Sequence, residues 1–340
     1  MSVPYSLDTV LLDSAEPADV DKLNDTLQKH DLGRPLGQAS RTAAGHLVVP
    51  VTDADPVVLL HTLKDERLRI DPIYHNGTFF LDDKDVGHAF AWAPITGEPG
   101  IEQPRWEPLP AHLRRPVIAL LDSGVRPHPR LPEHREDDPF LQVSDLLPEP
   151  WRSPVADGAG EPGIVPQEGH ATFMAGLIRV VAPSARVLSL RVMGDDGVVN
   201  ESTVVSALQW LTGHRAAGNP VDVVCMAFGR RPGDDGDHML HEIERLLRGL
   251  ADDGVSLVAS AGNNHRSDPV FPGAFDMVTA VGAGFGGYHA GFSNYGDWVD
   301  RYRDGVDVLS IMPPDRWARW SGTSFAAATF AGDIARPKLI

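Results

Sequence analysis

The sequence predicts an α/β fold in which a mostly parallel β-sheet is flanked by helices, preceded by a smaller α+β domain. Near-continuous apolar runs, typical of strands buried on both faces, occur at residues 117–121, 186–192, 221–227, 256–260 and 277–281. Helical patterns at residues 170–178, 202–216 and 238–251 lie between them. This alternation implies right-handed crossovers, and functional groups are then expected at the carboxyl ends of the strands.

The N-terminal region, residues 1–92, has the pattern of a ferredoxin-like α+β unit. Predicted strands cover residues 9–12, 46–52 and 78–81, and predicted helices cover residues 18–30 and 56–66. Residues 93–116 carry six prolines, which indicates an extended linker. Residues 117–340 form the predicted main domain, and 340 residues suffice for one large and one small domain.

Composition excludes several classes of protein. The formal net charge of -17 argues against nucleic-acid binding, which needs clustered Lys and Arg. No apolar run is long enough to span a membrane, and the chain starts without a secretory signal pattern. The one cysteine, Cys225, excludes an internal disulfide and fits a core position in a cytoplasmic protein. We expect neither a metal nor another cofactor.

Four polar residues stand at places where a strand ends or a helix begins. Asp122 follows the strand at 117–121, and Asn263 follows the strand at 256–260. His170 begins one helical pattern, and Ser324 directly precedes the apolar helical run Phe-Ala-Ala-Ala. Each has an ordinary explanation when taken alone: a turn, a local hydrogen bond or a helix cap.

Taken together, these residue types suit nucleophilic catalysis. A serine hydroxyl needs an imidazole as its base, and a carboxylate can orient that imidazole. Unpaired N–H groups at a helix N-terminus stabilise negative charge that develops beside Ser324. The amide of Asn263 can donate a hydrogen bond into the same place.

The segments that hold these residues resemble the signatures of the subtilase family. They read Asp122-Ser123-Gly124, Gly169-His170, Ala261-Gly262-Asn263 and Gly322-Thr323-Ser324-Phe325-Ala326. The order Asp, His, Ser agrees with subtilisin and differs from the chymotrypsin and α/β-hydrolase orders. The resemblance covers residues 117 to about 332. It implies a subtilisin-like three-layer fold and a serine endopeptidase whose triad is Asp122, His170 and Ser324, with Asn263 in the oxyanion hole.

The resemblance also implies a substrate site for peptides or proteins. One segment, made of Met226, Ala227, Phe228 and Gly229, would pair with an extended substrate as a β-strand. A second segment, made of Ser260, Ala261 and Gly262, would complete the wall of the primary side-chain pocket. By position, residues 1–92 resemble the propeptides that inhibit subtilases. A permanent accessory domain that recruits substrate is the alternative.

Several features depart from the family pattern. Ala328 replaces a proline usual four residues after the nucleophile, and Ala171 and Phe173 change the neighbours of His170. The connection 177–182 is too short for the calcium-binding loop of secreted relatives, so that site is expected to be absent. Residues 126–168 form a long, Pro-rich and acidic connection, for which a substrate-facing role and disorder both stay open. Two rival functions also stay open: an inactive peptide-binding module and a peptide ligase or cyclase.

Overall fold

The centre of the molecule is a mostly parallel sheet with the strand order β12-β11-β10-β9-β6-β8-β7, and β13 also pairs with β11. This is a computed structural model. It describes residues 113–131, 139–142, 166–194, 197–232, 238–285 and 288–336, and of the N-terminal part residues 9–12, 24–25, 28–29, 40–41, 47–50, 70–71 and 93–95. The strands of the sheet are β6 (Val117–Asp122), β7 (Leu141–Gln142), β8 (Arg186–Arg191), β9 (Val223–Met226), β10 (Ser256–Ser260), β11 (Val278–Phe285), β12 (Tyr288–His289) and β13 (Arg301–Asp304). Only the β11–β12 pair of this sheet is antiparallel.

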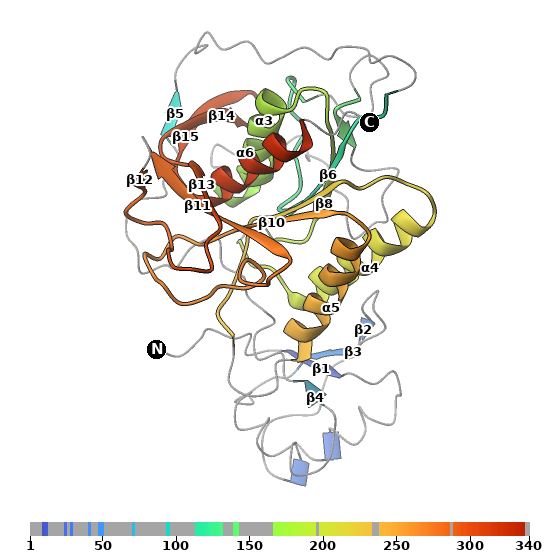
Figure 1. The fold of residues 1–340 in the computed structure, drawn as a ribbon. Helices are drawn as coiled ribbons and strands as arrows, with labels where there is room; N and C mark the ends of the chain where they lie inside the picture. The colour runs from blue at the N-terminus through green and yellow to red at the C-terminus, as the bar shows by residue number, and fades with distance from the viewer. Residues whose placement is uncertain are drawn as a thin grey trace.

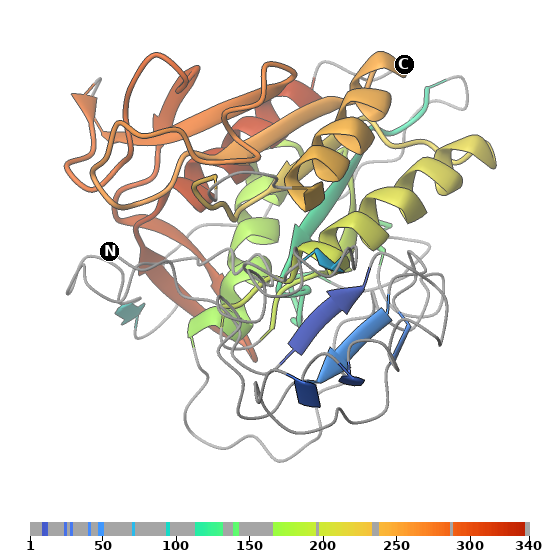
Figure 2. The same cartoon turned by 90° about the horizontal axis from the view of Figure 1, so that it is seen from below.

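Helices cover both faces of this sheet and produce three layers (Figures 1 and 2). One face carries α3 (His170–Val181) and α6 (Thr323–Ala335), which pack against each other. The other face carries α4 (Glu201–Ala216) and α5 (His238–Asp252), which also form a pair. A short 3-10 helix, η3 (Pro166–Gly169), leads directly into α3. The predicted strands and helices of the main domain are confirmed, with shifts of a few residues at their ends.

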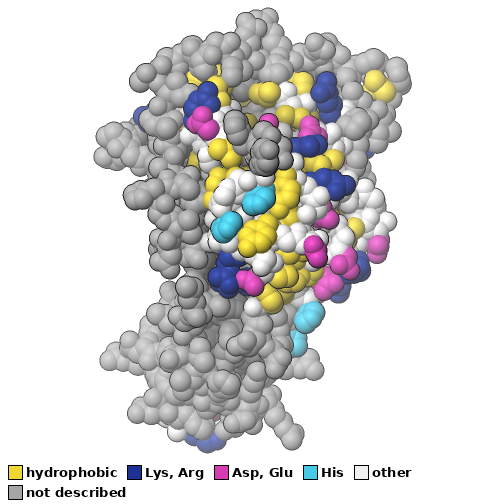
Figure 3. Space-filling view, turned by 60° about the vertical axis from the view of Figure 1, so that its left-hand side comes forward, with side chains coloured by type: hydrophobic (Ala, Val, Ile, Leu, Met, Phe, Trp, Pro, Cys, Tyr) yellow, Lys and Arg dark blue, Asp and Glu magenta, His cyan; other side chains and the backbone are white. Residues whose placement is uncertain are grey.

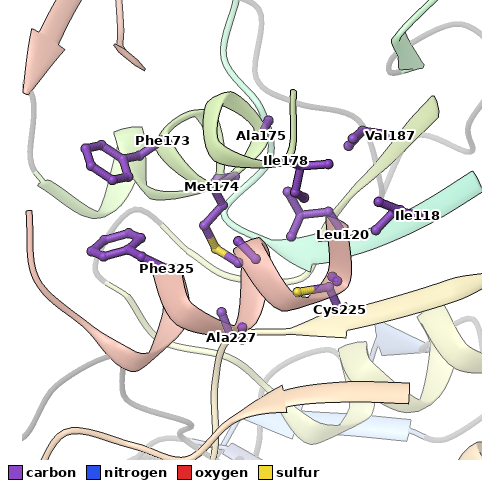
Figure 4. Close-up of a cluster of buried hydrophobic side chains, with 14 of the residues drawn as sticks. Ile118, Leu120, Phe173, Met174, Ala175, Ile178, Val187, Cys225, Ala227 and Phe325 are labelled. Atoms are coloured by element: carbon purple, nitrogen blue, oxygen red, sulfur yellow. The ribbon is translucent and has the colours of Figure 1, made fainter. Parts of the chain in front are cut away.

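Two hydrophobic clusters fill the spaces between the layers. The cluster under α4 and α5 is built from bulky aliphatic side chains such as Ile243 and Leu247. The cluster under α3 and α6, seen in Figure 4, combines Phe173, Met174 and Phe325 with many alanines. Alanine side chains take up little space between a helix and a sheet, so the backbones of α3 and α6 can lie close to the sheet. The two helices that carry His170 and Ser324 are therefore the tightly packed pair.

The strand register brings the candidate residues to one edge of the sheet. Leu121, next to Asp122, pairs with Met226 of β9, and Met226 pairs with Ala259 of β10. Since these strands are parallel, the residues that follow them leave the sheet on the same side. Asp122 and the chain segments 226–229 and 260–262 are thus neighbours at the carboxyl end of the sheet.

The described N-terminal strands form a four-stranded antiparallel sheet of order β2-β3-β1-β4. Its strands are β1 (Thr9–Leu12), β2 (Ser40–Arg41), β3 (Leu47–Pro50) and β4 (Ile70–Asp71), so the strands predicted at 9–12 and 46–52 form. Residues 24–25 and 28–29 are helical, as predicted for 18–30. The helix predicted at 56–66 and the strand at 78–81 lie outside the described residues. Figures 1 and 2 show this sheet on the side of α4 and α5.

Part of the predicted linker is paired rather than free. Residues Ala93–Ile95 form β5, which pairs antiparallel with β15 (Arg316–Trp320), and β15 in turn pairs with β14 (Val308–Met312). Further along the same stretch, Arg114 forms a bidentate ion pair with Asp222. The described residues 93–95 are extended, whereas residues 96–112 of the predicted linker lie outside the described residues. The proline-rich composition gave no sign of the sheet, because edge pairing depends on a partner that is more than 200 residues away.

The face of the described residues seen in Figure 3 is mixed in character. In Figure 3, hydrophobic, basic and acidic side chains alternate among the coloured residues, and neither sign of charge forms a continuous patch on that face. Within the described part of the chain, no helix is both long and apolar enough to cross a membrane.

Candidate active site

Asp122 is the last residue of β6, and its carboxylate is fully buried. Its Oδ1 accepts a hydrogen bond of 2.7 Å from the backbone N–H of Ser123. Its backbone oxygen accepts hydrogen bonds from Val192 and Met193, which fixes the end of the strand. A buried carboxylate requires such donors, because an unpaired charge in the interior is costly. Asp122 is therefore held rigidly in one orientation.

His170 is the first residue of α3, and it faces Asp122. Its Nδ1 lies 2.9 Å from Oδ1 and 3.0 Å from Oδ2 of that carboxylate, and the residue is 2% exposed. An Nδ1–H that donates to the carboxylate fixes the tautomer in which Nε2, on the opposite side of the ring, carries the lone pair. The Asp122–His170 contact is the geometry that a general base requires.

Two further contacts join the Asp122 loop to the start of α3. The Ser123 hydroxyl accepts a hydrogen bond of 3.2 Å from the Ala171 N–H, and the Thr172 hydroxyl accepts one of 2.9 Å from the Arg126 N–H. Thr172 belongs to the motif around His170 in the sequence, but its role was not predicted. These bonds fix the distance between the carboxylate and the imidazole.

Ser324 lies in the first turn of α6, which begins one residue earlier, at Thr323. The sequence had indicated a helix starting just after Ser324. Ser324 is 4% exposed and lies at the helix N-terminus, where the helix dipole is positive. Its neighbour Phe325 packs on His170 with ring centroids 5.4 Å apart. Strand β6 and helices α3 and α6 thus bring Asp122, His170 and Ser324 to the same edge of the sheet.

An aromatic cluster covers the His170 ring. Trp320 meets it edge-on with centroids 5.5 Å apart, and Trp320 also packs on Phe325 and Phe173. Trp320 ends β15, the strand that pairs with β5. Sequence reasoning did not identify Trp320, because no local pattern links a tryptophan four residues before a serine to a distant histidine.

Asn263 is buried next to the start of α6. Its Oδ1 accepts hydrogen bonds of 2.9 Å from both the backbone N–H and the hydroxyl of Thr323. The Thr323 hydroxyl also accepts a bond of 3.1 Å from the Gly262 N–H. These bonds orient the amide, so that its oxygen faces Thr323 and its NH₂ group lies on the other side, near Gly322. An amide donor is thus held beside the Ser324 turn.

Asn294 organises the loop that carries Asn263, and its role was missed in the sequence. This buried side chain donates a hydrogen bond of 2.8 Å to the Ala261 oxygen and accepts bonds from the N–H groups of Asn264 and Arg266. The backbone N–H of Asn294 donates a hydrogen bond to the backbone oxygen of Gly262. Asn294 lies in a segment that matches the family in sequence, Phe-Ser-Asn-Tyr-Gly, which was the available signal.

The remaining predicted residues lie close to this site. Met226, Ala227 and Phe228 are buried, and Gly229 is half-buried where the chain leaves β9. Ser260 and Ala261 are buried, with Gly262 half-buried next to them. Cys225 lies in the core, as predicted. Burial, with a smaller effect from the charge of Asp122, raises the pKa of its thiol well above the ordinary value.

One departure from the family pattern, Ala328, can be placed in the structure. Ala328 is buried inside α6, and the helix continues regularly through it to Ala335. Among the described residues, no group of three or more His, Cys, Asp or Glu side chains is placed to hold a metal ion. Of the 126–168 connection, residues 132–138 and 143–165 lie outside the described residues, so its role stays a prediction.

Comparison with known proteins agrees with this geometry. The model of the subtilase family matches residues 114–338. Subtilisin BL of Lederbergia lenta is 29% identical over 231 residues, which cover 65% of this chain and 75% of that protein. Alkaline elastase YaB of Bacillus sp. (strain YaB) is 31% identical over 231 residues, covering 65% of this chain but only 53% of the elastase.

Solved structures agree as well. A mutant of the protease domain of PatA matches 65% of this chain and 78% of its own chain, with a TM-score of 0.50 and 25% identity. A lanthipeptide protease matches 65% of this chain and 72% of its own chain, with a TM-score of 0.51. At 21% sequence identity, this match supports the fold alone. The family match covers more than half of the chain and spans every residue of the candidate site. The chain therefore belongs to the subtilase family, the family of subtilisin-like serine endopeptidases.

Proposed function

We propose that the protein hydrolyses peptide bonds through an acyl-enzyme on Ser324. His170 Nε2 takes the proton from the Ser324 hydroxyl as its oxygen attacks the scissile carbonyl carbon. The same nitrogen returns that proton to the leaving amine as the C–N bond breaks. Water then attacks the ester carbonyl while His170 takes its proton. The same nitrogen returns that proton to the Ser324 oxygen as the C–O bond breaks, which releases the carboxylic acid product and restores the free enzyme. The observation that carries the proposal is the buried Asp122–His170 contact beside the first turn of α6.

Asp122 and Asn263 complete the proposed machinery. Asp122 holds the imidazole tautomer and stabilises the imidazolium that forms when His170 accepts a proton. The Asn263 NH₂ group and the Ser324 backbone N–H stabilise the oxyanion of the tetrahedral intermediate. The two hydrogen bonds from Thr323 support this role, since they orient the amide before substrate binds.

The substrate is a peptide or protein in extended conformation. In this proposal residues 226–229 pair with the substrate backbone, and residues 260–262 line the pocket for its side chain next to the cleaved bond. Their position at the carboxyl end of the sheet, beside Asp122, supports the assignment. Apolar Met226 and Phe228 favour apolar or medium-sized side chains in that pocket.

Cleavage of a diverse peptide library by the full chain tests the proposal and reveals the pocket preference. The Ser324→Ala variant should lose activity on the order of 2 × 10⁶-fold in kcat, as in subtilisin. Cleavage that persists in Ser324→Ala would contradict it. If wild type binds peptides without cleaving them, the chain is a binding module. Ligated products with an added amine nucleophile would instead support the ligase alternative suggested by Ala328.

For residues 1–92 we propose a propeptide-like, inhibitory role. The described sheet β2-β3-β1-β4 lies on the side of α4 and α5, and β5 pairs with the strand that ends at Trp320 (Figures 1 and 2). Mass spectrometry of the purified protein checks the role, because maturation predicts a chain that begins near the linker. A fully active, intact chain would favour a permanent accessory domain. A cytoplasmic location stays a prediction from the single cysteine.

A further inference from the structure

A buried ion pair lies on the α4 side of the sheet. Glu201 is the first residue of α4 and is 4% exposed, and Arg230 follows Gly229 and is 6% exposed. Arg230 Nε donates a hydrogen bond of 2.6 Å to Glu201 Oε1, and its Nη2 contacts the same oxygen. Removing two charges from water costs solvation free energy that their attraction only partly returns, so stability alone is a weak reason for such a pair.

Arg230 also joins two chain segments through its backbone. Its N–H donates to the Phe271 oxygen at 2.9 Å, and the Phe271 N–H donates to the Arg230 oxygen at 2.8 Å. Its Nη1 donates to the Arg231 oxygen at 2.9 Å. The Arg230 side chain therefore connects the end of the 226–229 segment to the start of α4, and the Arg230 backbone connects it to the segment 270–273.

Segment 270–273 lies between the two proposed substrate-binding segments. A Cβ added to Gly229 would lie 2.5 Å from Val270 Cγ1 and 3.1 Å from the Phe271 oxygen. A Cβ added to Gly273 would lie 3.4 Å from the Ser260 oxygen. Because glycine permits both close approaches, segment 270–273 touches the 226–229 segment on one side and the 260–262 segment on the other. A shift of the Arg230–Phe271 bridge would then displace both walls.

We infer that Glu201 and Arg230 are positioning residues for the substrate groove. The pair fixes residues 226–229 relative to residues 260–262, and so sets how tightly an extended peptide binds, without acting on the reacting atoms. The inference rests on the proposed peptidase function. A guanidinium suits this task because its planar donors fix direction as well as distance. Small displacements at a groove matter, since a misplacement of about 1 Å can cost about 10²-fold in rate.

The ion pair between Arg114 and Asp222, in which the arginine is more exposed than Arg230, provides a control at the other end of β9. It has two hydrogen bonds of 2.7 and 2.8 Å and anchors the residue just before β9, whereas Arg230 lies just beyond the other end of that strand. In a parallel sheet this control lies at the end away from the active site. Losing either pair should affect the same strand, but only one of them borders the groove.

The test compares two double variants of the full chain, Glu201→Leu/Arg230→Met and Arg114→Met/Asp222→Leu. Two readouts are measured: labelling of Ser324 by a small fluorophosphonate, and hydrolysis of a peptide that fills the groove. We expect labelling rates within about 2-fold of wild type for both variants. For the first variant alone, kcat/KM for the peptide should fall about 10- to 100-fold, mainly through KM.

Unchanged peptide kinetics in the first variant would overturn the inference, as would equal losses in both double variants. Wild type that neither labels nor cleaves would instead refute the proposed function, and the inference with it. If the first variant does not fold, the Arg230→Lys variant tests the inference instead, because lysine keeps the positive charge but lacks the planar guanidinium donors. A raised KM with unchanged labelling then supports the positioning role, whereas equal losses of labelling and hydrolysis contradict it.

Discussion

The two faces of the central sheet differ in what their helices contribute. On one face, α3 begins at His170 and α6 carries Ser324 in its first turn. Small residues let these two helices pack closely against each other and against the sheet. On the other face, α4 and α5 rest on a thick aliphatic cluster. The buried ion pair between Glu201, at the start of α4, and Arg230 lies at the end of the proposed substrate segment 226–229. We infer that chemistry depends on the α3–α6 layer and that the α4–α5 layer supports the fold and the groove.

This division has a physical origin. Catalysis needs groups held within a fraction of an ångström, so the helices that carry them must lie close to the sheet and to each other. Alanine and glycine allow that approach. Bulk stability needs buried apolar area, which long aliphatic side chains provide more effectively. Changes on the α3–α6 face should therefore lower kcat, whereas changes on the α4–α5 face should affect stability or peptide binding and leave kcat nearly unchanged.

Asp122→Asn offers the strongest test of this contrast after removal of Ser324. The amide cannot hold the His170 tautomer as the carboxylate does, so kcat should fall about 10⁴-fold, as for the same change in a serine peptidase triad. Steady-state rates of peptide hydrolysis measure this fall in kcat. Asp222→Asn is the control just before the neighbouring strand β9, since it removes a buried carboxylate that pairs with Arg114. It should lower stability with kcat unchanged, and a comparable loss of kcat in both variants would break the assignment.

Asn263→Ala should have the next largest effect. Loss of its amide donor is expected to lower kcat about 10²- to 10³-fold with little change in KM, as for the corresponding donor of subtilisin. Steady-state kinetics on one peptide would show this split. The adjacent Asn264→Ala serves as control and should retain most of its activity. An Asn263→Ala variant with wild-type kcat would remove Asn263 from the oxyanion hole.

A pair of isoleucines compares the two layers directly. Ile178 of α3 and Ile243 of α5 are both fully buried, one on each face. Each change to alanine should reduce the free energy of unfolding by about 2–5 kcal/mol, through lost burial and a cavity. Urea unfolding measures this loss in the free energy of unfolding. Only Ile178→Ala should also lower kcat, because α3 carries His170, and equal kcat values for the two folded variants would contradict the division.

The smallest expected effect is a pH dependence of stability at His128. Burial lowers the pKa of this side chain, an effect that nearby Asp315 opposes and Arg130 reinforces. Its Nδ1 accepts a hydrogen bond from the Arg130 N–H. Because the folded pKa lies below the unfolded value of about 6.5, the unfolded state binds the proton more readily, and stability falls as pH drops below that value.

Urea unfolding at pH 8 and pH 5 tests this expectation. The loss of stability between the two pH values should be smaller in His128→Gln than in wild type, because glutamine does not titrate. An identical loss in both proteins would show that other groups account for the whole acid dependence.

The sequence predicted the parts of the molecule that local patterns determine. Apolar runs identified the strands of the main sheet, and Asp122 stood at a predicted strand end because β6 is buried on both faces. Contacts over long sequence distances were not predictable. The contact of Trp320 with His170, the hydrogen bond from Asn294 to Ala261 and the pairing of β5 with β15 all join segments that no periodicity connects. The Glu201–Arg230 pair likewise needed the fold, since neither residue stands in a recognisable motif.

The most direct test of the triad is to locate the adduct of diisopropyl fluorophosphate by mass spectrometry of digested protein. We predict one adduct, on Ser324, formed by wild type and reduced by orders of magnitude in His170→Ala, because the serine is nucleophilic only beside its base. Absence of an adduct on Ser324 in folded wild type, or equal labelling in His170→Ala, would contradict the triad.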